Sequence, residues 1–221
     1  MAQHLQREIE QLKKKVLALG ATVEGSVRKA VHSLEYRDTA LAEAVIAGDG
    51  DIDQSEVDLE EDCLKILALH QPVAIDLRFI VAVLKINSDL ERIGDLAGHM
   101  AERTLFLNAR QHITVPFDLS LLAEKAQVMV KQSLDSLVNL DAALARQVCE
   151  MDEEVDALHR ETFDLVKDAI RNRPEHLDML VTYLSVSRYL ERIADHATNI
   201  AEDAIYMVEG IIARHRDSSS D

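Results

Sequence analysis

A stretch of twelve residues occurs twice in this chain, one hundred positions apart. Glu91–Glu102 reads ERIGDLAGHMAE, Glu191–Glu202 reads ERIADHATNIAE, and seven of the twelve positions are identical. Unrelated sequence would match at about one position, so the chain contains a duplicated unit. Duplication predicts two similar halves and indicates where function is concentrated, because acidic residues are among those kept in both copies.

The charge of the chain narrows its possible partners. Asp and Glu total 40 against 24 Lys and Arg, which leaves a net charge of −16 over 221 residues. Such a field repels phosphate backbones and anionic lipid surfaces, so we expect no nucleic-acid binding. Cations or basic protein surfaces are the partners that this charge favours.

Composition indicates a helical protein outside the membrane. The chain has no Trp, four Phe and four Tyr, and it is rich in Ala, Leu, Glu and Asp, which favour helices. Its longest apolar run, Phe79–Leu84, is far shorter than the roughly 18 residues of a membrane span. The N-terminal segment lacks the apolar region of a signal peptide, so we expect a cytoplasmic protein without membrane insertion. Cys63 and Cys149 read as buried, reduced thiols.

Apolar residues recur at spacings of three and four between sparse Pro and Gly residues, which predicts six helices. We place turns at Gly48–Gly50, Pro72, Pro116 and Pro174. The expected helices are Leu5–Ala47, Asp51–Leu69, Ala74–Ala109, Phe117–Cys149, Glu153–Arg171 and Glu175–Ala213. The fold class is therefore all-α, a tandem pair of antiparallel three-helix bundles covering residues 1–112 and 113–221. Residues 217–221 are expected to form a disordered tail.

The third helix of each half carries the clearest buried stripe. Its members in the two halves are Val83, Ile86, Leu90, Ile93, Ala97 and Met100, and Val186, Leu190, Ile193, Ala197, Ile200 and Ala204. On a helical wheel, Glu91, Asp95 and Glu102 lie about 100–140° from Leu90, so these carboxylates point outward. Outward acidic residues are commonly just solvated, which is the plain alternative to a function.

Two features favour a cation site over solvated charge. Glu91 and Asp95 are like charges one helical turn apart, an arrangement that repels by roughly 0.2–0.5 kcal/mol and recurs at Glu191 and Asp195. A second acidic pair stands at the expected start of each second helix, at Asp49 and Asp53 and at Asp152 and Asp156. Helix capping would explain Asp49 and Asp152 but not the second residue of each pair.

Small residues allow these pairs to converge. Gly94 and Gly98, replaced by Ala194 and Thr198 in the second copy, would let a neighbouring helix approach closely. Four carboxylates per half form a hard oxygen-donor set suited to Mg, Mn, ferric iron or Ca rather than to a tetrahedral structural zinc.

The remaining polar residues of the repeat are weaker candidates. His99 and His196 are possible peripheral ligands, although surface histidines are commonly incidental. Arg92 and Arg192 could pair with carboxylates, meet a partner or form local helix salt bridges.

These residues together resemble the PhoU family of phosphate-uptake regulators. The resemblance rests on DGDID (Asp49–Asp53), QPVAIDLRFI (Gln71–Ile80), LERIGDLAGHMAE (Leu90–Glu102), MDEEVD (Met151–Asp156) and LERIADHATNIAE (Leu190–Glu202). It covers essentially the whole chain, from about Leu5 to Ala213. The second copy departs from it where RNRPEHLDML replaces QPVAIDLRFI, so the Leu77–Arg78 motif is not duplicated.

The resemblance implies a cytoplasmic regulator without catalytic activity that often forms a homodimer. It would couple the ATPase subunit of the phosphate ABC transporter to a sensor histidine kinase and silence phosphate-starvation genes when phosphate is plentiful. It also implies bound metal ions, with iron, manganese, magnesium or zinc as the expected cofactors. The implied ligands are Asp49, Asp53, Glu91 and Asp95 for one site and Asp152, Asp156, Glu191 and Asp195 for the other.

Two alternatives stay open. One is a helical adaptor in which the acidic pairs are solvated and metal plays no part. The other is a carboxylate-bridged di-iron enzyme, which needs inward-facing Glu residues and paired E-x-x-H motifs. The sequence contains no E-x-x-H, which disfavours the enzyme.

Overall fold

The computed structural model describes residues 2–210 and consists of helices joined by short turns and one longer linker. The helices are α1 (Ala2–Tyr36), α2 (Thr39–His70), α3 (Ala74–Asn108), α4 (Ser120–Asn139), α5 (Ala142–Asn172) and α6 (Leu177–Glu209), with a 3₁₀ turn η1 (Pro174–His176) before α6. The predicted all-α class and the six helices are confirmed. The expected tail at 217–221 and the last residues of the sixth predicted helix lie outside the described part of the chain.

The first turn of each half lies earlier than the sequence indicated. We placed the first at Gly48–Gly50, but α1 ends at Tyr36, and Arg37 takes a left-handed conformation with φ of 55°. The Asp38 carboxylate then caps α2 by accepting a hydrogen bond of 2.9 Å from the Leu41 amide. Helix α2 runs straight through both glycines, so the predicted first helix was too long and the second too short.

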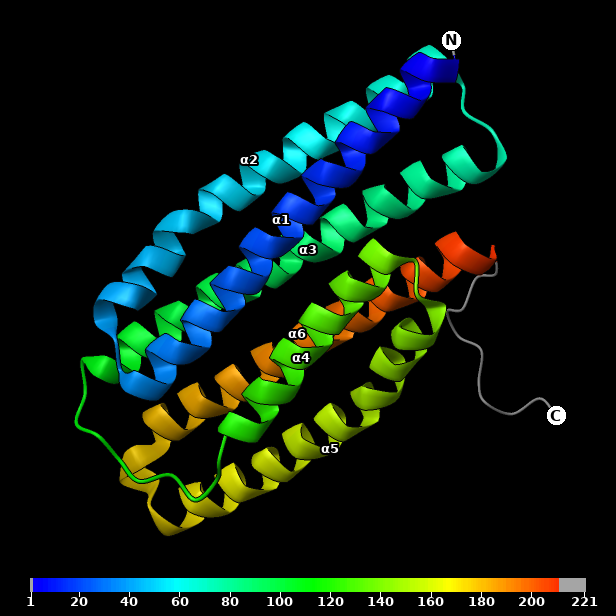
Figure 1. Cartoon of the computed structure of the whole chain (residues 1–221). Coiled ribbons are helices and arrows are strands. Elements are labelled where there is room, and N and C mark those ends of the chain that lie inside the picture. The colour runs from blue at the N-terminus through cyan, green and yellow to red at the C-terminus, as the bar shows by residue number, and fades with distance from the viewer. Residues whose placement is uncertain (1, 211–221) are drawn as a thin grey trace, which may run out of the picture.

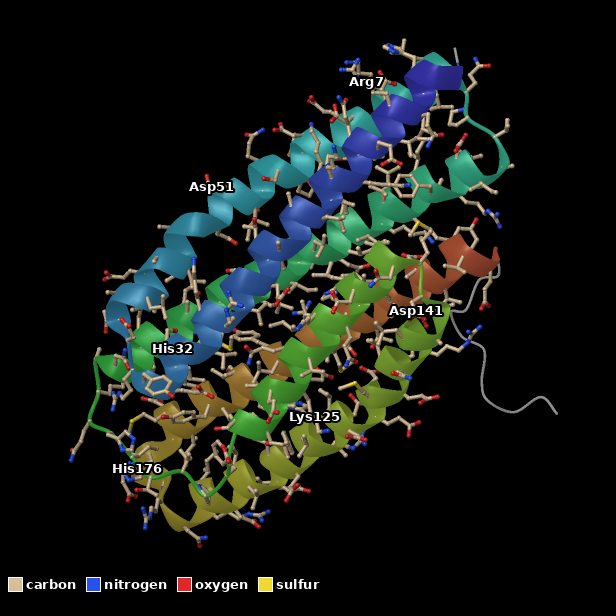
Figure 2. The ribbon with its side chains drawn as sticks, in the orientation of Figure 1. Arg7, His32, Asp51, Lys125, Asp141 and His176 are labelled. Atoms are coloured by element: carbon tan, nitrogen blue, oxygen red, sulfur yellow. The ribbon has the colours of Figure 1, made fainter. Side chains whose placement is uncertain are left out.

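In the second half, too, the first turn lies earlier than predicted. Its first turn falls at Leu140, with φ of 52°, and not beside Cys149. The Asp141 carboxylate caps α5 by accepting hydrogen bonds of 3.0 Å from the amides of Ala143 and Leu144. Figure 2 labels Asp141 at this helix start. Both true caps belong to a repeated pattern, D-x-A-L-A, at Asp38–Ala42 and Asp141–Ala145.

Helices α1, α2 and α3 form one antiparallel bundle, and α4, α5 and α6 form the other. Figure 1 shows α2 and α5 at the two outer edges, with α3 and α6 side by side between the halves. The predicted stripe of each third helix is confirmed, since every one of its members is buried. The buried apolar cluster continues from one half into the other across α3 and α6.

Polar contacts fix the register between α3 and α6. Asp89, which is buried, receives a hydrogen bond of 3.1 Å from Asn199 and lies 2.8 Å from His196 Nδ1. Lys85 forms an ion pair of 3.1 Å with Asp203. Lower-numbered residues of α3 therefore meet higher-numbered residues of α6, so the two helices run in opposite directions. A one-turn slip would leave Asp89 buried without partners, which costs about 1–3 kcal/mol or more for a charged group.

The two cysteines are free thiols, as expected, although only Cys63 is fully buried and Cys149 is half-buried. Burial raises the pKa of Cys63 to about 12 and that of Cys149 to about 11. Both thiols are therefore protonated and unreactive at neutral pH.

None of the helices within residues 2–210 has an apolar stretch long enough to cross a membrane.

The mid-helix glycines give a prediction about stability. A Cβ added at Gly25 or Gly50 meets no atom within 4 Å, and glycine inside a helix costs about 0.5–1 kcal/mol relative to alanine. Gly25→Ala and Gly50→Ala should each raise the free energy of unfolding by about that amount in urea denaturation. Gly20→Ala is the contrast, because its Cβ would lie 2.7 Å from a Leu134 methyl group. Destabilisation by Gly50→Ala would contradict the continuous α2 described above.

Candidate metal centres

The first candidate centre lies between α2 and α3. Asp49 and Asp53 stand one turn apart on α2 and face Asp95 on α3, with carboxylate oxygens that all lie within 4.8 Å of one another. Both α2 residues are well inside the helix. The capping alternative for Asp49 is therefore wrong, because the cap is Asp38.

Glu91, the fourth predicted residue, belongs to the same electrostatic group without joining that closest trio. Burial, followed by the charges of Asp95 and Asp53, raises the pKa of Glu91, while Arg92 lowers it. The pKa of Asp49 is raised in the same way, by burial and then by Asp95 and Asp53. Asp95 and Asp53 thus act electrostatically on both Asp49 and Glu91.

The second centre lies between α5 and α6 and uses the corresponding residues. Asp156, Glu191 and Asp195 bring carboxylate oxygens within 4.8 Å of one another. Asp152 stands one turn before Asp156, and its pKa is raised by burial and then by Asp195 and Asp156. Asp152 lies inside α5, so capping does not explain it either.

Small residues set the close approach of the helices, as expected. An added Cβ at Gly94 would lie 3.1 Å from two side-chain atoms of Ile52, and one at Gly98 would lie 3.7 Å from the Asp49 carboxylate. In the second half Thr198 takes the place of Gly98 and donates a hydrogen bond of 3.3 Å to Asp152. The first centre is therefore more open beside α3, and the second contains a hydroxyl that fixes one carboxylate.

The two candidate histidines differ in their surroundings. His99 is exposed, its ring centroid lies 5.8 Å from that of Tyr189, and its charge lowers the pKa of Asp49. His196 is oriented by Asp89 at the contact between the halves, so its Nδ1 is not available as a peripheral ligand. Within the described residues, Arg92 and Arg192 form no ion pair, so the local salt bridges considered for them are absent.

Several residues beside the centres were missed from sequence. Glu56 and Asn87 form a contact next to the first centre, and His159 and Ser187 form the matching contact next to the second. Arg160 pairs with Asp156 at 3.4 Å. The helical spacing from Asp53 to Glu56 and from Asp156 to His159 places these residues on the same face, and that spacing could have revealed them.

The donor sets fit a hard metal ion. Each centre offers carboxylates only, from two helices, and oxygen ligands of this kind suit magnesium, manganese, calcium or iron. A bound cation would remove the mutual repulsion that raises the carboxylate pKa values. Six of the eight predicted residues offer the closest oxygen donors, namely Asp49, Asp53 and Asp95 in the first centre and Asp156, Glu191 and Asp195 in the second.

Comparison with known proteins identifies the family of the chain. Residues 16–104 and 119–204 each match the PhoU domain. The chain belongs to the PhoU family. It is 33% identical to a "Phosphate-specific transport system accessory protein PhoU homolog" of Clostridium acetobutylicum, over 92% of this chain and 93% of that protein. It is 38% identical to the Aquifex aeolicus protein of the same name, over 95% of each.

Solved PhoU structures share the fold. The crystal structure of PhoU from Pseudomonas aeruginosa matches with a TM-score of 0.90 and 35% identity, over 93% of this chain and 99% of that one. The PhoU structure from Streptococcus pneumoniae, named a phosphate transport system regulatory protein, matches with a TM-score of 0.84 and 28% identity, over 94% and 98%. The PhoU relatives are named as accessory or regulatory proteins, which confirms that this chain is not an enzyme.

The raised pKa values give a prediction about pH. For Asp49, Glu91, Asp152, Glu191 and Asp195 the folded chain binds protons more readily than the unfolded chain. Stability of the metal-free protein should therefore increase as pH falls through the raised values toward the ordinary values of 3.8 and 4.5. An Asp49→Asn, Glu91→Gln, Asp152→Asn, Glu191→Gln variant should lose most of this increase, measured by urea denaturation in chelator between pH 7 and 5. Equal pH dependence of variant and wild type would contradict the clustering.

Proposed function

We propose that the chain is a regulatory accessory protein of phosphate-specific transport. It couples the ATPase subunit of the phosphate ABC transporter to a sensor histidine kinase and represses starvation genes when phosphate is plentiful. The observation that carries the proposal is the match along nearly the whole length of relatives named for this transport system. The adaptor acts in the cytoplasm, where it meets both partners, and assembles as a homodimer.

The proposal includes metal binding at both centres. Iron, manganese, magnesium or zinc would be held by Asp49, Asp53, Glu91 and Asp95 and by Asp152, Asp156, Glu191 and Asp195. The ion supplies positive charge, and the carboxylates come from α2 and α3 or from α5 and α6. Binding therefore ties an outer helix to a central one in each half and stabilises the folded chain by about 2.7 kcal/mol when the ion is at 100 times its Kd.

An exposed apolar surface supports the adaptor role. The turn between α2 and α3 presents four apolar side chains to solvent: Leu69 is 65% exposed, Val73 75%, Ile75 68% and Leu77 39%. Exposed apolar groups that lie together commonly mark a contact with another protein. We call these four apolar residues the apolar tip. Basic residues lie near it: Lys65 and Arg78 flank it in sequence, and Figure 2 shows Arg7 at the same end of the molecule.

The second half provides an internal comparison for the apolar tip. The corresponding turn of the second half differs in length and contains η1, and it carries Asn172, Arg173, Glu175 and Leu177. The connection between α5 and α6 therefore forms with three of these four residues polar, so a turn at this place does not require four exposed apolar side chains. Contact with a partner would remove these side chains from water, which is a physical reason for their place at the turn.

The competing functions are less well supported. A di-iron enzyme requires inward carboxylates, but Asp53 and Asp195 are exposed and the other cluster residues are half-buried between an outer and a central helix. A metal-independent adaptor stays the alternative, and it differs from the proposal only at the two centres.

Gene deletion tests the regulatory role. A strain that lacks the chain should express a phosphate-starvation reporter in phosphate-rich medium. The reason is that the transporter ATPase and the kinase are then no longer coupled, so the starvation genes are not repressed. Expression of the wild-type chain from a plasmid should restore repression of the reporter, while the empty plasmid should not. A silent reporter in the deletion strain would remove the regulatory proposal.

Substitution at the apolar tip tests the docking surface. Val73→Asp with Ile75→Asp should weaken binding to the purified ATPase subunit or the cytoplasmic part of the kinase by about tenfold or more, because two apolar contacts are lost. Leu177→Asp with Val181→Asp is the matched control, since both residues are 46% exposed on the second hairpin. Surface plasmon resonance measures both, with circular dichroism as the folding check. Equal losses in the two variants would argue against the tip, and failure of the wild type to bind either partner would argue against the adaptor.

A further inference from the structure

The two centres have the same carboxylates but different neighbouring cations. Arg160 Nη1 lies 3.4 Å from Asp156 Oδ2 in the second centre, and Arg188 stands one turn before Glu191 on α6. Alignment of the repeats places Val57 and Ser88 at these two positions in the first half. Two guanidinium groups of the second centre therefore have no counterpart in the first.

The first centre, in turn, has acidic neighbours that the second centre lacks. Glu56 and Glu60 follow Asp53 on α2, whereas His159 and Phe163 follow Asp156 on α5. Asn87 Nδ2 donates to the Glu56 backbone oxygen at 2.9 Å and to its carboxylate at 3.3 Å, which holds Glu56 against α3. The first centre thus gains acidic neighbours at positions where the second has an imidazole and a phenyl ring.

The residues around the matching glutamates show the same difference. Arg188 and Arg192 both stand within one helical turn of Glu191 on α6, whereas Ser88 and Arg92 stand at these positions around Glu91 on α3. The sequence therefore places one more cation beside Glu191 than beside Glu91.

We propose that the two centres bind divalent cations with unequal affinity, the α2–α3 centre filling first and the α5–α6 centre last. This rests on the proposed metal binding. An ion entering the second centre meets repulsion from Arg160 and Arg188 and must take Asp156 from its ion pair. Two such charges beside the carboxylates reduce affinity on the order of tenfold in a solvent-exposed setting.

Unequal affinity gives the duplicated sites different roles. The tighter α2–α3 centre is occupied at low ion concentration and supports its half of the molecule throughout. The weaker α5–α6 centre changes occupancy over a higher range, so only the second half responds to the supply of cations.

Titration of the metal-free full chain with Mn²⁺, followed by the electron paramagnetic resonance signal of the free ion at near-physiological salt, tests the order. The wild type should bind in two steps about tenfold apart in Kd. Asp49→Asn with Asp95→Asn should remove the tighter step, and Asp156→Asn with Glu191→Gln the weaker one. The proposed order of filling would be overturned if Asp156→Asn with Glu191→Gln removed the tighter step. It would also be overturned if the wild type bound Mn²⁺ in a single step. No Mn²⁺ binding by the wild type would instead overturn the metal proposal.

Exchange of the neighbouring cations tests the cause. Arg160→Val with Arg188→Ser should tighten the weaker step about tenfold, and Val57→Arg with Ser88→Arg should weaken the tighter step by a similar factor. Arg171→Val is the matched control, because Arg171 pairs with Asp168 at 2.7 Å near the far end of α5, and it should move neither step. Unchanged steps in both exchange variants, with folding verified by circular dichroism, would overturn the assignment of the difference to Arg160 and Arg188.

Discussion

The close contact of an outer helix with a central helix is the constraint on which both centres depend. Ile52 is buried at Gly94, where a Cβ would come within 3.1 Å of it, and full burial of an isoleucine contributes about 1.5–3 kcal/mol. That gain is larger than the repulsion of about 0.2–0.5 kcal/mol between like charges one helical turn apart. Apolar packing can therefore hold Asp49 and Asp53 against Asp95 before any ion arrives, and the acidic site is preorganised at the expense of charge repulsion.

The central pair of helices makes this contact rigid. Helices α3 and α6 are buried against each other as well as within their own bundles, so α2 and α5 rest on a support that is packed on several sides. Buried Asp89, with His196 and Asn199 as partners, permits only one register between the halves. The register of α3 against α6 is thus fixed by groups other than their clustered carboxylates, which face α2 and α5 instead.

Much of this arrangement could be predicted from sequence, and the failures have physical reasons. The buried stripe through Leu90 and Leu190 follows from helical periodicity, which a packed helix must obey. The two acidic clusters follow from duplication, because the paired carboxylates of the first half recur at matching positions in the second half. The turns were misplaced because Gly48 and Gly50 are strong breaking signals, yet a long packed helix tolerates about 1 kcal/mol for each. The capping residues Asp38 and Asp141 carried the better signal. The contact between the halves was missed because Asp89 and His196 pair across residues distant in sequence, which no local pattern reveals.

The contact between the halves also connects the two centres. Asp89 stands two residues before Glu91, and its partner His196 directly follows Asp195, so one hydrogen-bonded pair joins the helix turns that carry a ligand of each centre. A slip of α6 against α3 at this turn would break the contact between His196 and Asp89 and would also move Asp195. Because packed helices shift as units rather than deform continuously, this contact keeps the two acidic clusters in one fixed relative position. Two separate bundles of the same sequence would lack that connection.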